Sequence, residues 1–107
     1  MDNPIIKQIL QELRQLLASH YGPALVDIIL YGSHARGMAT EESDIDVMVI
    51  LQGKVLPCKE IDVIAESVYE INLKYNVLIS LFPISEADYK SRNTPLLINV
   101  RKEGVPA

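Results

Sequence analysis

Residues 25–51, LVDIILYGSHARGMATEESDIDVMVIL, place a short polar turn between two apolar runs. The first run, residues 25–31, is apolar and β-branched enough to predict a strand, and the run from Asp44 to Leu51 predicts a second one. Gly32 allows the chain to turn sharply after the first strand and allows a ligand to approach the backbone closely. We therefore expect two strands joined by a turn that binds a ligand.

Residues 33–37 of this turn predict an anion site. Ser33 can open a short helix, whose first backbone N–H groups and positive end favour an anion such as a triphosphate. Arg36 follows three residues later, so on a helix it returns to the same side and adds a forked donor to phosphate oxygens. Gly37 would end the turn. Arg36 has a second possible role, since its guanidinium could pair with Glu41 or Glu42 and order the loop.

Asp44 and Asp46 lie one residue apart at the start of the second apolar run. Strand periodicity puts both carboxylates on one face, while Ile45 points to the other. Two such oxygens suit Mg²⁺ held jointly with substrate phosphates. An isolated Asp-x-Asp is usually a solvated strand end or a helix cap, and a glycine-serine turn alone is weak. Their conjunction at this spacing predicts a phosphate-and-metal site.

The order G-S-x-A-R-G followed by S-D-I-D resembles the minimal nucleotidyltransferases of the DNA polymerase beta superfamily. The ending FPISEADYKSRNTPLLINVRKEGVP also looks like the tail of small stand-alone members, so the resemblance covers nearly the whole chain. The residues at positions of the family motif are Gly32, Ser33, Ala35, Arg36, Gly37, Ser43, Asp44, Ile45 and Asp46.

The resemblance implies a role for most of these positions. Gly32 and Ser33 would grip the phosphates of the nucleotide, with Arg36 and Ser43 as further binding positions. Asp44 and Asp46 would bind one or two Mg²⁺ ions, and together with Ser33 they are the candidate catalytic residues. ATP would be the substrate.

One departure from the family pattern concerns the third carboxylate, which usually lies on a later strand and activates the attacking hydroxyl. The candidate strand here is Val77 to Ile84, and it contains no acidic residue. Ser80 occupies the expected place, and a serine hydroxyl is a poor metal ligand and a poor base at neutral pH. An ordinary strand hydroxyl that faces a neighbour is the preferred interpretation of Ser80, ahead of any catalytic role. The nearest acids by sequence are Asp27, Asp62, Glu66, Glu86 and Asp88.

Composition predicts a single globular domain over residues 1–107, with 49% hydrophobic and 22% charged residues. The net charge of −4 and the absence of any Lys/Arg cluster argue against direct nucleic-acid binding. Asp2, Asn3 and Lys7 interrupt the first ten residues, and no apolar stretch approaches the ~20 residues of a membrane helix. We therefore expect a cytoplasmic protein without a membrane segment.

The remaining elements predict an α/β fold, in which a small mixed sheet carries helices mainly on one face. Helical spacing of apolar residues predicts helices from Pro4 to before Gly22 and from Cys58 to Tyr75. A third strand is expected over Val77 to Ile84. Short helices should follow Ser85 and Thr94, which are typical N-cap residues. This arrangement agrees with the polymerase beta-like nucleotidyltransferase fold that the resemblance implies.

With three predicted strands and no separate substrate-binding domain, the chain must take a small acceptor or borrow a surface from another chain. The resemblance includes antitoxins of two-gene systems, whose partner is a helical HEPN ribonuclease toxin, and implies transfer of AMP to a toxin tyrosine. Our leading hypothesis is therefore a Mg²⁺-dependent protein adenylyltransferase in a homo- or hetero-oligomer.

Three alternatives to this hypothesis remain. The chain could be a catalytically silent domain that binds a nucleotide or caps a partner, as the serine at position 80 suggests. It could transfer a nucleotide to a small molecule such as an aminoglycoside, although that normally requires an additional domain. A purely structural subunit would leave the constellation from Gly32 to Asp46 unexplained.

Overall fold

Four strands form one mixed sheet in the order β3-β2-β1-β4. The computed structural model describes residues 4–37 and 44–107. The central strand β2 pairs antiparallel with β1 and parallel with β3, and β4 pairs antiparallel with β1. The bounds are β1 Leu25–Tyr31, β2 Ile45–Leu51, β3 Ile79–Ser85 and β4 Val105–Pro106.

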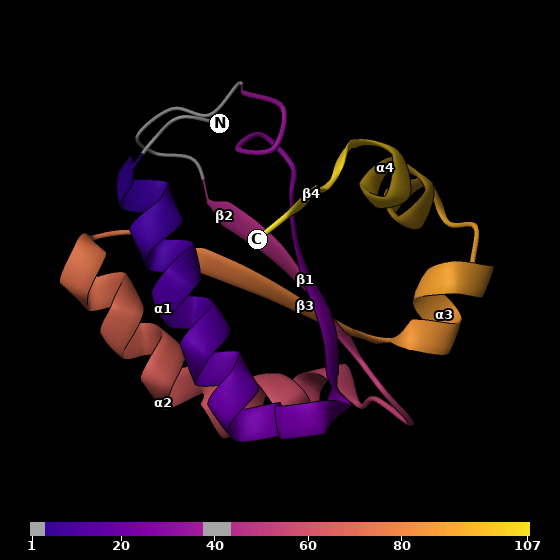
Figure 1. Cartoon of the computed structure of the whole chain (residues 1–107), viewed down its shortest axis with the longest axis horizontal. Helices are drawn as coiled ribbons and strands as arrows, with labels where there is room; N and C mark the ends of the chain where they lie inside the picture. The colour runs from indigo at the N-terminus through magenta and orange to yellow at the C-terminus, as the bar shows by residue number, and fades with distance from the viewer. Residues whose placement is uncertain (1–3, 38–43) are drawn as a thin grey trace.

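Helices cover the two faces of the sheet unequally (Figure 1). The long helices α1 and α2 lie side by side on one face, and the short helices α3 and α4 lie on the other. Helix α2 connects β2 to β3, as a parallel strand pair requires. The bounds are α1 Pro4–Tyr21, α2 Pro57–Tyr75, α3 Glu86–Ser91 and α4 Pro95–Glu103, with a 3-10 turn at Gly22–Ala24.

The face beneath α1 and α2 holds the larger core. Alternate residues of β1 and β2 point into it, and apolar residues of both helices recur at helical spacing to meet them. Among its α1 residues, Ile9, Leu13 and Leu17 are completely buried. The other buried members are Ile6, Leu10, Ile28, Leu30, Ile45, Val47, Val49, Leu51, Ile64, Val68, Ile71 and Ile79.

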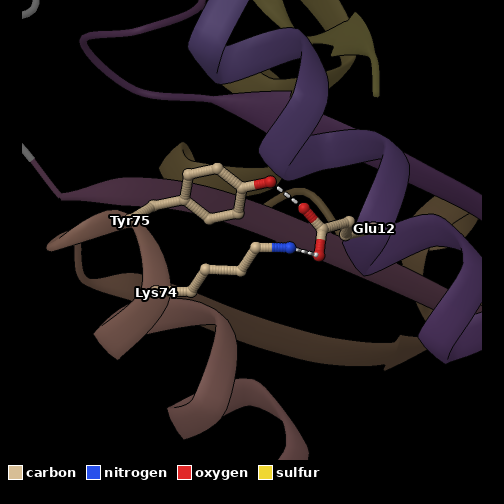
Figure 2. A network of polar contacts seen from close by, with 3 residues as sticks. All are labelled: Glu12, Lys74 and Tyr75. Atoms are coloured by element: carbon tan, nitrogen blue, oxygen red, sulfur yellow. Dashed lines mark hydrogen bonds and ion pairs between the residues drawn. The ribbon is translucent and has the colours of Figure 1, made fainter.

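A polar network joins α1 to the last turn of α2 (Figure 2). The Glu12 carboxylate accepts a hydrogen bond from Lys74 Nζ at 3.0 Å and another from the Tyr75 hydroxyl. The Lys74 ammonium also lies 5.3 Å from the centroid of the Tyr75 ring. These contacts fix the angle between the two helices at the rim of the larger core.

The opposite face holds a smaller core, in which α4 covers the middle of β1 and β2. Its buried members are Ile29, Met48, Ile50, Ile84, Leu97 and Val100. Side-chain caps begin both short helices: Ser85 accepts from Asp88 N at 3.1 Å, and Thr94 accepts from Leu97 N at 3.2 Å. The first turns of α3 and α4 therefore have the caps that the sequence predicts.

Both edge strands are poorly suited to pairing with another strand. Ile45 N donates to Leu78 O at 2.9 Å, so the backbone N–H and C=O groups of even-numbered β3 residues point toward β2. Those of the odd-numbered residues point to the outer side. On the outer side, Ile79 N donates to Asn72 Oδ1 at 3.0 Å, and Pro83 has no N–H group. The other edge, β4, is two residues long and includes Pro106. The sheet is thus protected against strand addition at both sides.

The predicted fold class is confirmed, and so are the three predicted strands and four of the five predicted helices to within two residues at most ends. The fourth strand, Val105–Pro106, was not predicted. The short helix expected from Ser33 is wrong, because residues 32–37 form a turn. Within the described residues, no helix is both long and apolar enough to cross a bilayer.

Candidate functional site

Three polar side chains line up across three strands at one end of the sheet. Asp46 is the register partner of Tyr31 on β1 and of Ser80 on β3. Paired residues of neighbouring strands point to the same face, which here is the face of α3 and α4. Asp44 immediately precedes β2 and is exposed, whereas Asp46 and Ser80 are half-buried. The predicted pair of carboxylates therefore lies at the start of β2, beyond the part of this face that α4 covers.

Gly32 brings the turn directly against Asp46. Its φ of +73° is a left-handed conformation, and a Cβ placed there would lie 2.5 Å from Asp46 Oδ2. Real Cβ atoms essentially never approach another atom so closely. The glycine is thus required twice, once by the backbone conformation and once by the carboxylate beside it.

Two backbone hydrogen bonds shape the rest of the turn. Arg36 N donates to Gly32 O at 3.2 Å, and Gly37 N donates to His34 O at 3.4 Å. Gly37 then adopts φ +69°, which stops the helical path after one turn. Ala35 packs against the larger core, and Arg36 is exposed. The anion site expected at Ser33 must therefore rely on the N–H groups of a turn, since the helix dipole of a longer element is absent here.

The neighbouring carboxylates of Asp44 and Asp46 determine the electrostatics around the row of Tyr31, Asp46 and Ser80. Partial burial raises the pKa of Asp46 and the charge of Asp44 raises it further, while His34 lowers it. Burial and the nearby Asp46 likewise raise the pKa of the Tyr31 hydroxyl. Ionised Asp46 is thus held against a like charge, which a bound cation would relieve. Tyr31 stays protonated at neutral pH and can act as a hydrogen-bond donor beside the carboxylate.

Comparison with known proteins gives the family of this site. A family model described as "Nucleotidyltransferase domain" matches residues 6–99, which include the whole turn and both aspartates. The chain belongs to the nucleotidyltransferase domain family.

Relatives of this nucleotidyltransferase domain occur in Methanocaldococcus jannaschii. One, named "Putative protein adenylyltransferase MJ1305", is 36% identical over 104 residues, which cover 94% of this chain and 69% of the relative. Another of the same description, MJ0604, is 34% identical over 99 residues, which cover 92% of this chain and 93% of the relative.

Solved structures share the fold at lower identity. A chain of a toxin–antitoxin crystallised with AMP-PNP has a TM-score of 0.63 and 21% identity, and the match covers 90% of this chain and 69% of that one. A nucleotidyltransferase of Sulfolobus solfataricus, so described provisionally, has a TM-score of 0.54 and 17% identity, with 99% and 87% covered.

The chemistry of the candidate site fits a hard divalent cation shared with phosphates. Asp44 and Asp46 offer only oxygen ligands on one face, and their mutual repulsion favours a cation between them. Over residues 4–37 and 44–107, no group of three or more His, Cys, Asp or Glu side chains gathers into a complete metal cage. Further ligands would have to be phosphate oxygens or water, which is the usual habit of Mg²⁺.

Ser80 lies where the sequence placed it, on the strand next to Asp46 and at the same level. None of the five candidate acids shares this row. Asp27 pairs with Ile50 toward the opposite end of the sheet, and Asp62 and Glu66 are exposed on α2. Glu86 and Asp88 belong to α3, which begins after the far end of β3. Among the described residues, the row thus holds the Asp46 carboxylate between the hydroxyls of Tyr31 and Ser80, with Asp44 beside it and no third acid.

Two predictions about the turn fall on residues 38–43, outside the described residues. Ser43 is one, and the pairing of Arg36 with Glu41 or Glu42 is the other. The sequence analysis did not predict Tyr31 as a site residue. The one indication in the sequence is that Tyr31 immediately precedes Gly32. The pairing of Tyr31 with Asp46 depends on strand register, which that indication does not reveal.

Two surface hollows lie away from this row. One of about 560 Å³ lies between α1 and α2, where Glu12 and Lys74 are among the lining residues. The other, of about 970 Å³, lies beside β4 and is lined in part by Lys7 and Arg14. Neither is lined by the described residues of the turn or by the two aspartates.

Proposed function

We propose that this chain, acting as a single domain over residues 1–107 in the cytoplasm, transfers AMP from ATP to a hydroxyl of a partner protein. The partner would be a HEPN ribonuclease toxin, and the chain its antitoxin. The observation that carries the proposal is the placement of Asp46 between the Gly32 turn and Ser80, with Asp44 beside it. The names of the Methanocaldococcus jannaschii relatives, which read "Putative protein adenylyltransferase", support the choice of a protein acceptor.

In the proposed reaction, the acceptor oxygen forms a bond to the α-phosphorus of ATP. The bond from that phosphorus to the bridging oxygen breaks, pyrophosphate leaves with the electron pair, and the hydroxyl proton passes to a base or to water. Mg²⁺ bound by Asp44 and Asp46 would supply neutralisation of the charge that develops on the phosphates. Ser33 and the N–H groups of the turn would bind the triphosphate, and Arg36 would add a forked donor.

Gly32 has a steric role in this mechanism. Because it has no side chain, the turn can approach Asp46 closely enough for phosphates bound by the turn to reach an ion bound by the carboxylate. Such prior positioning of both reactants is a large part of catalysis in phosphoryl and nucleotidyl transfer.

The test is incubation of the purified chain with radiolabelled ATP, Mg²⁺ and the product of the adjacent gene, followed by intact-mass analysis of both proteins. The expected result is one AMP added to the partner, and no addition with the variant that combines Asp44→Asn and Asp46→Asn. The double variant should also lose Mg²⁺-dependent ATP binding while it stays folded. Unchanged Mg–ATP affinity in that variant would disprove the metal assignment.

A second candidate function follows from Ser80. If no group replaces the third carboxylate, the domain would bind a nucleotide and neutralise the partner by contact alone. A stable complex without a change in mass would support this reading. Ser80→Asp distinguishes the two further, because an added base beside Asp46 should raise transfer at least about tenfold if its absence limits catalysis. Ser80→Asn, which is similar in size to Asp but cannot act as a base, is the control.

A further inference from the structure

Two large apolar side chains flank Ser80: Leu78, which immediately precedes β3, and Phe82 within β3. Leu78 is 55% exposed and Phe82 is 37% exposed, although both belong to an otherwise apolar strand region. Residues at spacing two along a strand share a face, so all three point to the side of Asp46. Their odd-numbered neighbours Ile79 and Leu81 point instead toward the larger core. Leu78, Ser80 and Phe82 therefore form a strip of side chains on the face of the sheet that carries Asp46.

This strip runs parallel to the two carboxylates at the distance of one strand. The bond from Ile45 N to Leu78 O places Leu78 beside Asp44, and the strand register places Ser80 beside Asp46. Neighbouring strands lie about 4.8 Å apart. A group that rests on the strip is consequently within one side-chain length of a phosphate held at the carboxylates.

The chemistry of the strip restricts what can rest there. Strand β3, Ile79–Ser85, contains no charged side chain, and Phe82 offers an aromatic surface. A polycationic acceptor such as an aminoglycoside would require carboxylates on the acceptor side, which β3 does not supply. A protein segment with apolar or aromatic residues around its hydroxyl would bury the exposed surfaces of Leu78 and Phe82 favourably.

We infer that Leu78, Ser80 and Phe82 form the acceptor platform, on which an apolar segment of a partner protein places its hydroxyl beside Asp46. The inference rests on the proposed adenylyltransferase function and adds the surface and the kind of segment that it recognises. Contact is through side chains, because Pro83 and the Asn72 cap leave the outer backbone of β3 unsuited to strand addition.

The chain offers a matched control on its other side. Leu73 is 63% exposed on α2, the helix that covers the opposite face of the sheet. Leu73→Ser removes at least as much exposed apolar surface as Leu78→Ser, and it does so on a helix that packs on the face of the sheet opposite to Asp46. A difference in acceptor KM between the two variants would therefore arise from where the leucine lies and not from the loss of apolar surface in general.

The experiment measures AMP transfer to the product of the adjacent gene by the wild-type chain, Leu78→Ser, Leu78→Ser with Phe82→Ser, and Leu73→Ser. We expect the KM for the acceptor protein to rise about tenfold in Leu78→Ser and further in the double variant. The kcat and the Mg–ATP affinity should stay within about threefold, because the platform does not touch the nucleotide. Leu73→Ser should behave as wild type. Thermal unfolding checks that each variant is folded. If the double variant is unstable, the result for the single variant Leu78→Ser decides the test.

Three results would overturn the inference. An unchanged acceptor KM in Leu78→Ser, with transfer by the wild-type chain intact, would overturn the platform while the proposed function stands. An equal rise in Leu73→Ser would show that the effect does not depend on this surface. Transfer of AMP by the wild-type chain to an aminoglycoside, with none to the protein, would overturn the platform and the protein acceptor together.

Discussion

The two faces of the sheet differ in how completely helices cover them. Beneath α1 and α2, apolar residues fill a continuous core that includes both ends of β2, from Ile45 to Leu51. On the other face, α4 covers the middle of the sheet, and the end with Tyr31, Asp46 and Ser80 stays partly exposed. We therefore expect the two faces to have different roles. The face beneath α1 and α2 should supply most of the stability, and the uncovered end of the other face is accessible to ligands.

Among the variants at the exposed end of the sheet, Gly32→Ala should cause the largest loss of AMP transfer. The added Cβ would meet Asp46 Oδ2 at 2.5 Å, so either the turn or the carboxylate must move. Displacements of this size commonly reduce catalysis about 100-fold or more. We expect a loss of that order in AMP transfer and a matching loss of Mg–ATP binding, both measured on the folded variant.

Gly53→Ala is the control for backbone strain. Gly53 has φ +81° but no atom within 4 Å of the point that a Cβ would occupy, so alanine there brings the strain without the clash. Gly53→Ala should lose about 1 kcal/mol of stability, and Gly32→Ala, which adds the clash, should lose at least as much. Only Gly32→Ala should lose activity. If Gly53→Ala lost as much, general strain would account for the result, and the contact with Asp46 would not.

Leu13→Ala and Leu97→Ala compare the stability that each face supplies. Leu13 is completely buried in the larger core, and Leu97 is 2% exposed in the smaller one. Cavity formation should cost about 4 kcal/mol for Leu13→Ala and about 2 kcal/mol for Leu97→Ala, because the smaller core can relax toward its open end. Urea unfolding measures both losses. An equal or greater loss for Leu97→Ala would contradict the division of roles between the faces.

Glu12→Gln tests the polar network at the rim of the larger core. The substitution removes the charge that accepts hydrogen bonds from Lys74 and Tyr75, and it should cost about 1 kcal/mol in urea unfolding. Glu86→Gln is the control, because Glu86 pairs with Lys90 at 3.2 Å on the surface of α3. An exposed pair at that spacing contributes about 0.3 to 0.5 kcal/mol. Equal losses would mean that the network adds nothing beyond a surface ion pair.

The sequence predicted elements better than it predicted their relation to one another. Apolar periodicity and capping residues were enough for the three longer strands and the four helices, because each is a local property. The strand Val105–Pro106 is too short for any periodicity, and its pairing with β1 appears only in the fold. The helix expected at Ser33 fails because Gly37 leaves the helical conformation after one turn.

The candidate site shows the same limit. The sequence brought together Gly32, Asp44 and Asp46 by motif, and Ser80 by its place on the third strand. It did not reveal Tyr31 as a neighbour of Asp46, nor the contact between Gly32 and that carboxylate. Both depend on the register of β1 against β2, which is set by packing over the whole strand.

Asp46→Asn should have the smallest effect on stability, and the sign of that effect is informative. Burial and Asp44 raise the pKa of Asp46 in the folded chain above the ordinary value of 3.8, so ionisation of Asp46 costs stability. That cost is absent below the ordinary pKa and is fully present above the raised one. Without Mg²⁺, Asp46→Asn should therefore raise the Tm by about 1 to 2 °C at pH 7.5, a small gain because solvent still screens the half-buried carboxylate.

The pH dependence and the response to ligand decide whether this gain comes from the site. The gain should shrink as the pH falls through the raised pKa of Asp46 toward its ordinary value of 3.8, because the wild-type carboxyl then becomes protonated. Asp27→Asn, which removes one carboxylate at the other end of the sheet, is the control. Adding Mg–ATP should reverse the order, because ligand binding stabilises the wild-type chain and the variant cannot bind the ion. A Tm that falls without Mg²⁺ would mean that Asp46 stabilises the fold. The exposed end of the sheet would then be part of the framework, and the contrast between the two faces would no longer hold.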